Sequence, residues 1–407
     1  MDEASLPSRT RSRSRSRSRR GGLATLVDPR DAFVTATFLL VTIGTVMVFS
    51  ASTFRWSLNG DAYFFLRRQL AWLPIAILGC LLVRNLDYRL CRRHYWEPLV
   101  VSILLLAIVL IPQVGRDVNQ SRRWLPLGAG LQFQPSELGK LAVILFVAGF
   151  MAGDPERRRR FFRGFLVVAL SVFPVFALVL VEPDFGTAMF ILGLGFFVLL
   201  LSGIRTVYLL GSALLFAPVI ALFVHLRWEQ IHSRLLGFLD PESVYQVRHS
   251  LIALGSGGWW GVGLGASGQK LHFLPEPHTD FILAVLGEEL GLAGTLGTLL
   301  LFLVLLWSGI GIVWRTRDLF GFLLGAGVVI SLTFQAVLNV AVVTASAPTK
   351  GIPLPFVTHG GSGLCMTLVQ VGLLLSIDRM NRLERAAEEG MSEADAGPSG
   401  HCHGSGP

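Results

Sequence analysis

The most constraining feature of this sequence is a series of long apolar runs that recurs along almost its whole length. A helix needs roughly 20 apolar residues to cross about 30 Å of hydrocarbon, and the backbone of each crossing segment must satisfy its own hydrogen bonds. Only 15% of the residues are charged, against about 25% in a soluble domain. The chain is therefore predicted to be an all-α polytopic membrane protein.

Ten segments are expected to cross the membrane, several of them short or containing Gly and Pro, which membrane helices tolerate. They are residues 32–52, 70–83, 98–112, 138–153, 164–181, 187–203, 206–226, 281–307, 319–345 and 360–377. With the N-terminus inside, about twice as many Arg and Lys residues fall in inside segments as in outside segments. We therefore expect both termini to be cytoplasmic, and a large extracytoplasmic loop, 227–280, to join spans 7 and 8.

The two ends of the chain, residues 1–30 and 386–407, are expected to be disordered cytoplasmic tails on either side of a membrane domain at 31–385. Residues 9–20 read RTRSRSRSRSRR and contain nothing apolar to bury. Such repeats occur in RNA-binding proteins, but beside a membrane span we favour contact with anionic lipid and expect no nucleic acid partner. The four cysteines indicate neither a disulfide framework nor a zinc site.

The large loop holds the densest group of ionisable residues. A helix is predicted to follow a Ser243 N-cap and to end at Gly255. A glycine-rich stretch comes next, and residues 270–280 then contain Lys270, His272, Glu276, His278 and Asp280. Because ionisable groups are costly to hold at a membrane boundary, such a cluster indicates a functional site by default.

Asp280 directly precedes the eighth apolar segment. Thr279 or Asp280 could cap the N-terminus of that helix, which would lower the pKa of the Asp280 carboxyl. An ionised carboxylate at the outer boundary is also what a general base requires. The two roles are compatible, and both predict that Asp280 is ionised.

Other polar residues lie in or beside the spans. Glu288 and Glu289 should face the bundle interior, where Lys140 is a plausible partner; a structural ion pair is at least as well supported as a catalytic role. Gly360 and Gly361 open the last span and would allow close helix packing or leave N–H groups for an anion. Glu182 and Asp184 lie in a turn between two spans. The Pro and Gly of this turn could have a purely structural role, or the turn could present the two carboxylates to a ligand.

Positive charges outside the membrane need a reason, since the positive-inside rule disfavours them. They cluster beside aromatic residues in loops 53–69, 113–137 and 227–280. They could handle an anionic ligand or anchor the protein at the interface. The residues alone leave two function classes open, a transporter and an enzyme acting on a lipid-linked anion.

The chain closely resembles the SEDS family, the shape, elongation, division and sporulation proteins, and within it the division subfamily FtsW more than its sister RodA. The matching pieces are FSAS (49–52), FFLRRQLAW (64–72), SRRWLPLG (121–128), QPSELGKL (134–141), EPDFGTA (182–188), residues 245–291 with HTDF and GEELG, and residues 338–361 with PTKGIPLPF. The family usually has Asn-Gly-Ala where this chain has Asn119-Gln120-Ser121. Likewise, Thr358–Gly363 reads THGGSG where SYGGSS is usual.

This resemblance implies a peptidoglycan glycosyltransferase that polymerises lipid II at the outer face of the bacterial cytoplasmic membrane, at the division septum, releasing undecaprenyl diphosphate. Asp280 matches the essential Asp of the family. A class B penicillin-binding transpeptidase of the FtsI type and divisome regulators are the implied partners. A divalent cation, Mg²⁺ or Mn²⁺, could accompany the pyrophosphate, although no metal site is visible in the sequence. The expected substrate-binding residues are Arg68, Arg123, Trp124, Glu182, Asp184, Arg248, Lys270, His278 and Lys350.

Three alternatives compete with a septal polymerase: a lipid II flippase, an elongation polymerase of the RodA type, and a scaffold without activity. A flippase would hold its critical charges near the bilayer midplane, often at broken helices of repeated halves. Here the densest charged cluster lies at the outer edge, and no internal repeat is found. These observations favour the enzyme, and the HTDF sequence argues against an inactive scaffold.

Overall fold

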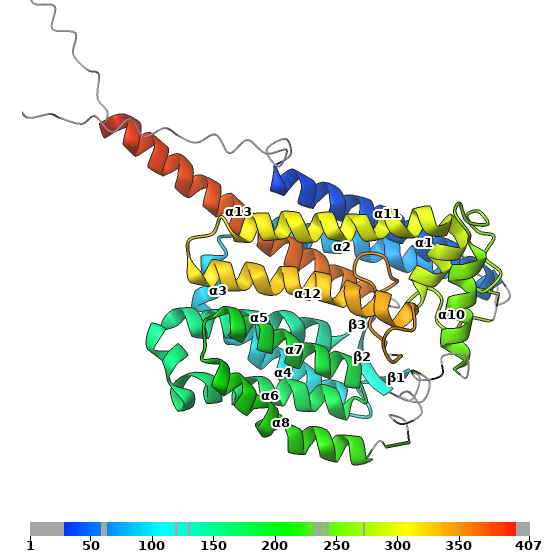
Figure 1. The fold of residues 1–407 in the computed structure, drawn as a ribbon, viewed down its shortest axis with the longest axis horizontal. Coiled ribbons are helices and arrows are strands. Elements are labelled where there is room, and N and C mark those ends of the chain that lie inside the picture. The colour runs from blue at the N-terminus through cyan, green and yellow to red at the C-terminus, as the bar shows by residue number, and fades with distance from the viewer. Residues whose placement is uncertain are drawn as a thin grey trace, which may run out of the picture.

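The computed structural model describes residues 28–395 apart from 58–62, 119–120, 129–130, 272, 350 and most of 227–243. Nearly all of the described regular structure is helical (Figure 1). The α-helices are α1 (Pro29–Ser57), α2 (Phe64–Asn85), α3 (Arg89–Arg93), α4 (Glu97–Val109), α5 (Pro135–Gly153), α6 (Leu166–Val181), α7 (Phe185–Leu201), α8 (Thr206–Leu226), α10 (Tyr245–Ser256), α11 (Ile282–Val313), α12 (Leu319–Val343) and α13 (Gly361–Asp395). A 3₁₀ turn, η2 (Pro155–Arg159), and a π turn, η3 (Phe161–Phe165), precede α6.

Each of the ten predicted spans overlaps one of these helices. Among the described residues, seven helices are long and apolar enough to cross a membrane. Three further apolar stretches are shorter, Glu97–Val109, Phe185–Leu201 and Phe216–Leu226. The prediction of a multi-pass helical membrane protein is therefore confirmed.

The long helices lie side by side and give the molecule two distinct ends (Figure 1). The start of α1 and the projecting end of α13 lie at one end, and α10 and the strands lie at the other. Helix α5 lies at the centre, and almost its whole circumference is buried from Pro135 to Met151. Its apolar side chains on every face are therefore explained by helix packing rather than by lipid contact.

The all-α prediction is wrong for the segment between α4 and α5. It forms a small antiparallel sheet of β1 (Arg116–Val118), β2 (Ser121–Gly128) and β3 (Leu131–Phe133), with β2 in the middle. Arg116 pairs with Trp124, and Leu125 pairs with Phe133. The strands of this small sheet pair with one another outside the helix bundle. β2 is directed toward the turn between α6 and α7.

Part of the segment predicted as a disordered C-terminal tail is helical, since α13 continues to Asp395. Glu384 and Glu388 pair with Arg89 and Arg317, which tie the extension to neighbouring segments. Residues 1–27 and 396–407, where the rest of the predicted tails falls, lie outside the described residues.

Candidate functional site

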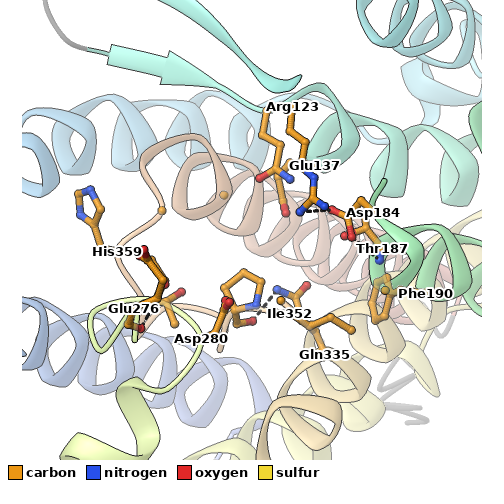
Figure 2. A pocket seen from close by; sticks show the side chains of 18 of the residues that line it. Arg123, Glu137, Asp184, Thr187, Phe190, Glu276, Asp280, Gln335, Ile352 and His359 are labelled. Carbon is orange, nitrogen blue, oxygen red and sulfur yellow. Dashed lines mark hydrogen bonds and ion pairs between the residues drawn. The ribbon is translucent and has the colours of Figure 1, made fainter. Parts of the chain in front are cut away.

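A cavity of about 760 Å³ lies at the end of the bundle that carries the sheet. Its walls come from β2, the start of α5, the turn before α7, the loop before α11 and the segment between α12 and α13. In Figure 2, Arg123 reaches from β2 toward Asp184, and Asp280 and Glu276 lie across the cavity. Segments far apart in the sequence thus enclose one polar space.

Asp280 lines this cavity two residues before α11 begins at Ile282. Its backbone carbonyl accepts a hydrogen bond of 2.9 Å from the buried amide of Asn339, which donates a second one to Ile352. A side chain at Gly351 would begin 3.3 Å from the Asp280 carboxylate. These contacts fix the backbone of Asp280 and keep one side of its carboxyl group clear.

The prediction that Asp280 is an ionised helix cap is wrong. The N-cap position of α11 is Phe281, and no side chain caps the helix. Burial, and secondarily the negative charges of Glu276 and Asp184, raise the pKa of the Asp280 carboxyl to about 7, against the opposing effect of Arg123. The carboxyl therefore exchanges its proton near neutral pH, as a general base should.

Arg123 organises the turn between α6 and α7. It donates hydrogen bonds to the backbone carbonyls of Glu182 (3.2 Å) and Pro183 (2.8 Å) and forms an ion pair with Asp184 at 3.3 Å. Asp184 also caps α7 by accepting a hydrogen bond from the N–H of Thr187. The guanidinium thus has structural partners on one side, while Arg123 and Trp124 both line the cavity.

The Glu182 side chain is turned into the protein and is only 1% exposed. Both of its carboxyl oxygens are buried without a hydrogen-bond partner among the described residues. Burial, and secondarily the charge of Asp184, raises the pKa of Glu182 to about 8, against the effect of Arg123. Glu182 is therefore a neutral acid at pH 7, and it does not line the cavity as predicted.

The predicted ion pair between Lys140 and Glu288 or Glu289 is wrong. The Lys140 ammonium lies 2.8 Å from the Glu137 carboxylate, one turn earlier on α5, and donates a 3.0 Å hydrogen bond to Gln335. Lys140, Glu137 and Gln335 all line the cavity. The pairing of Glu137 with Lys140 was not predicted, although the i,i+3 spacing of the two residues indicates it.

Glu288 and Glu289 instead hold the large loop. The Glu289 carboxylate pairs with Lys270 at 2.8 Å and accepts a hydrogen bond from Ser50, and all three groups are buried. Glu288 accepts hydrogen bonds from the Ser267 hydroxyl and from the N–H of Gly268. Lys270 was predicted to bind substrate, but its ammonium is used within this pair and it does not line the cavity.

Two histidines lie at the edge of the site. The backbone N–H of His359 donates to the carbonyl of His278 at 2.9 Å, and the ring of Phe65 packs against that of His278 at a tilt, with ring centroids 4.2 Å apart. Burial, and secondarily the nearby His278 and Arg68, lower the pKa of His359 to about 3. His359 is therefore neutral and lines the cavity, whereas His278 is buried behind it.

The remaining predicted residues are divided between the cavity and other places. Arg68 is on α2 with its guanidinium over Phe64, and Arg248 is exposed on α10; neither lines the cavity. Gly360 lines it, and Gly361 packs so closely on Trp72 that a Cβ there would lie 2.1 Å from the indole. Lys350 lies outside the described residues.

Together these features define a class, a multi-pass helical membrane protein with a titratable carboxyl group in a polar cavity at one end of its bundle. The family model described as "Cell cycle protein", whose label combines FtsW, RodA and SpoVE, matches residues 30–383. The chain therefore belongs to this family, that of the SEDS proteins.

Similar proteins carry names from different cellular roles. The chain is 39% identical over 361 residues to "Stage V sporulation protein E" of Bacillus subtilis (strain 168), covering 87% of this chain and 98% of that protein. It is 39% identical over 345 residues to the "Probable peptidoglycan glycosyltransferase FtsW" of Trichlorobacter lovleyi, and the match covers 83% of this chain and 90% of that protein. A solved chain from "Structural coordination of polymerization and crosslinking by a peptidoglycan synthase complex" superimposes with a TM-score of 0.69 at 29% identity, covering 86% of this chain and 97% of that chain.

Proposed function

We propose that this protein is a peptidoglycan glycosyltransferase that polymerises lipid II into glycan strands and releases undecaprenyl diphosphate. The observation that carries the proposal is Asp280, whose carboxyl group lies in a polar cavity with a pKa of about 7. The relatives named as probable peptidoglycan glycosyltransferases support the same reaction class.

In the proposed reaction, the 4-hydroxyl of the acceptor sugar attacks the anomeric carbon of the donor. A new C–O bond forms as the bond to the diphosphate breaks, and the diphosphate leaves with the bonding electrons. Asp280 accepts the hydroxyl proton and later returns it to water. Arg123 supplies positive charge at the cavity wall, and Trp124 supplies an aromatic surface for a sugar ring.

A divalent cation, Mg²⁺ or Mn²⁺, remains part of the proposal. The described residues include no group of three His, Cys, Asp or Glu side chains able to hold a metal. Magnesium is commonly held by one or two carboxylates together with substrate phosphates, and Asp184 and Asp280 both line the cavity. Asp184 would hold the ion together with the diphosphate, whose negative charge the ion would offset, and Asp280 would stay free to act as the base.

The proposed topology has ten spans, both termini in the cytoplasm, and the cavity at the outer face of the bacterial cytoplasmic membrane. It is supported by the charge bias of the sequence and by the gathering of the cavity segments at the end opposite the start of α1. Both substrates could then keep their lipid tails in the bilayer while their sugars react in the cavity.

We further propose a class B penicillin-binding transpeptidase of the FtsI type as the partner, with divisome regulators and a location at the septum. The similar chain in a peptidoglycan synthase complex supports a crosslinking partner. The GEELG and PTKG sequences favour the division role over elongation.

The decisive experiment compares wild type, Asp280→Asn and the control Asp31→Asn, each purified with the partner transpeptidase and supplied with lipid II. Asp31 is an exposed carboxylate in the first turn of α1, remote from the cavity. We expect glycan polymer from wild type and Asp31→Asn and none from Asp280→Asn, with partner binding retained. Unimpaired polymerisation by Asp280→Asn would exclude Asp280 as the general base. Translocation of lipid II without polymer formation would favour a flippase.

A further inference from the structure

Helix α11 is broken near its start. Gly291 has φ 68° and ψ −166°, so the helical hydrogen bonds stop there and resume afterwards. Gly291 is buried, and a buried backbone group without a partner costs free energy comparable to a lost hydrogen bond. The break therefore needs an external source of hydrogen bonds.

Residues 257–263 of the large loop provide it. The bonds run from Val262 N to Glu288 O, Gly263 N to Glu289 O, Leu292 N to Gly258 O and Ala293 N to Trp259 O, at 3.0, 3.1, 2.8 and 3.1 Å. Groups on both sides of the break are thus paired with one loop segment, which is built into α11 rather than resting on it.

Glycines make this close approach possible. A Cβ at Gly257 would lie 2.0 Å from the carbonyl oxygen of Gly287, and one at Gly261 would lie 2.1 Å from that of Glu289. Gly261 and Gly291 also have positive φ angles, 79° and 68°, which glycine adopts without steric cost. Backbone thus contacts backbone, and the side chains of the segment must point away from α11.

Those side chains are apolar and exposed. Trp259 is 70% exposed, Trp260 is 83% exposed and Leu264 is 58% exposed. Residues 257–268 contain no charged residue. The patch is continuous with a stripe of exposed apolar residues at helical spacing on α11, namely Leu292, Leu296, Leu300, Leu303, Trp307 and Ile310. Such a stripe on a membrane-spanning helix faces lipid.

The position of the patch along α11 matches the edge of the hydrocarbon. The stripe ends near exposed Trp314, after which the inner-side Arg315 and Arg317 follow. From Ala293, which bonds to Trp259, to Trp314 the helix rises by roughly 32 Å, close to the thickness of about 30 Å for the hydrocarbon. Trp is enriched at both membrane interfaces, and the two ends of this stripe carry Trp.

We propose that residues 257–264 form a membrane-insertion element, seated in the outer headgroup region with Trp259, Trp260 and Leu264 in contact with lipid. The element is held from behind by the buried Lys270–Glu289 pair and by the bonds of Glu288 to Ser267 and Gly268. The large loop is thereby anchored in the bilayer as well as in the bundle.

The test uses an environment-sensitive fluorophore on single cysteines, introduced after replacement of Cys80, Cys91, Cys365 and Cys402 and reconstituted in phosphatidylcholine–phosphatidylglycerol vesicles. Leu264→Cys reports on the element. Leu300→Cys is the lipid reference, and Met391→Cys, 63% exposed on the projecting end of α13, is the water reference. We expect the label at 264 to be quenched by nitroxide lipids, like that at 300, and to resist aqueous iodide.

A label at 264 that behaves like the one at 391 would overturn the proposal. So would a label that resists both quenchers, because protein would then cover the patch. A second measurement keeps the native cysteines: wild type and the Trp259→Phe/Trp260→Phe variant are compared in vesicles of brominated lipids. We expect the difference in fluorescence between the two proteins to be much smaller in brominated vesicles than in unbrominated ones; a difference of the same size in both kinds of vesicle would refute lipid contact.

Discussion

The pKa of Asp280 leads to a quantitative prediction for the pH dependence of glycan polymerisation. Raising this pKa from 3.8 to about 7 corresponds to roughly 4 kcal/mol against ionisation. A general base works in its ionised form, so the initial rate should rise with pH, reach half its maximum near pH 7 and level off about one pH unit above. At pH 5, about one hundredth of the carboxyl groups would be ionised, and the rate should fall in proportion.

The neighbours of Asp280 provide the control. Glu276 raises this pKa through its negative charge, so Glu276→Gln should move the midpoint of the profile to lower pH without removing activity. The assay is the initial rate of polymerisation from lipid II between pH 5 and 9, with protein integrity checked at each pH. A rate that stays at its plateau down to pH 5, or a midpoint unchanged in Glu276→Gln, would refute the assignment of the profile to a buried Asp280.

Three further predictions concern the frame around the site, each measured by thermal unfolding in detergent beside wild type. Asn339→Ala leaves the backbone carbonyls of Asp280 and Ile352 without their hydrogen-bond donor. It should lower the free energy of unfolding by about 2–4 kcal/mol and slow polymerisation. A variant as active as wild type would contradict the role of Asn339 in positioning Asp280. Lys270→Met leaves the Glu289 carboxylate buried without its cation and should lower the free energy of unfolding by about 3–5 kcal/mol. The double variant Lys270→Met/Glu289→Leu should recover most of this loss, and no recovery would argue against the ion pair. Gly361→Val overlaps Trp72 and should cost roughly 1–3 kcal/mol, whereas Gly360→Ala, with open space around it, should be close to neutral.

The positions of the membrane helices could be predicted because apolar runs are local and the bilayer thickness limits their length. The pairing of buried charges between different segments could not be predicted. Lys270 lies in the loop and Glu289 on α11, and only the tertiary fold brings them to 2.8 Å, whereas the pair of Lys140 with Glu137 is local to α5. The raised pKa of Asp280 was missed for the same reason, since capping is a local property and burial is a tertiary one. Strands β1 and β3 were missed because three-residue segments carry too short a pattern. The eight-residue β2 reads SRRWLPLG and was missed because its apolar and polar residues do not alternate.

The break at Gly291 explains how Asp280 keeps a defined position although it follows a long loop. Residues 282–290 form a separate short helix between Asp280 and the break, and Glu288 and Glu289 on that helix bind residues 267–270 of the same loop. The loop therefore contacts α11 at the break as well as joining it at Asp280, so Asp280 cannot shift relative to residues 257–263 without breaking backbone hydrogen bonds. If residues 257–264 lie in the headgroup region, this connection holds the Asp280 carboxyl at a constant height above the bilayer. A constant height suits a reaction between two lipid-linked sugars, because their reacting atoms are held at a fixed distance from the same surface.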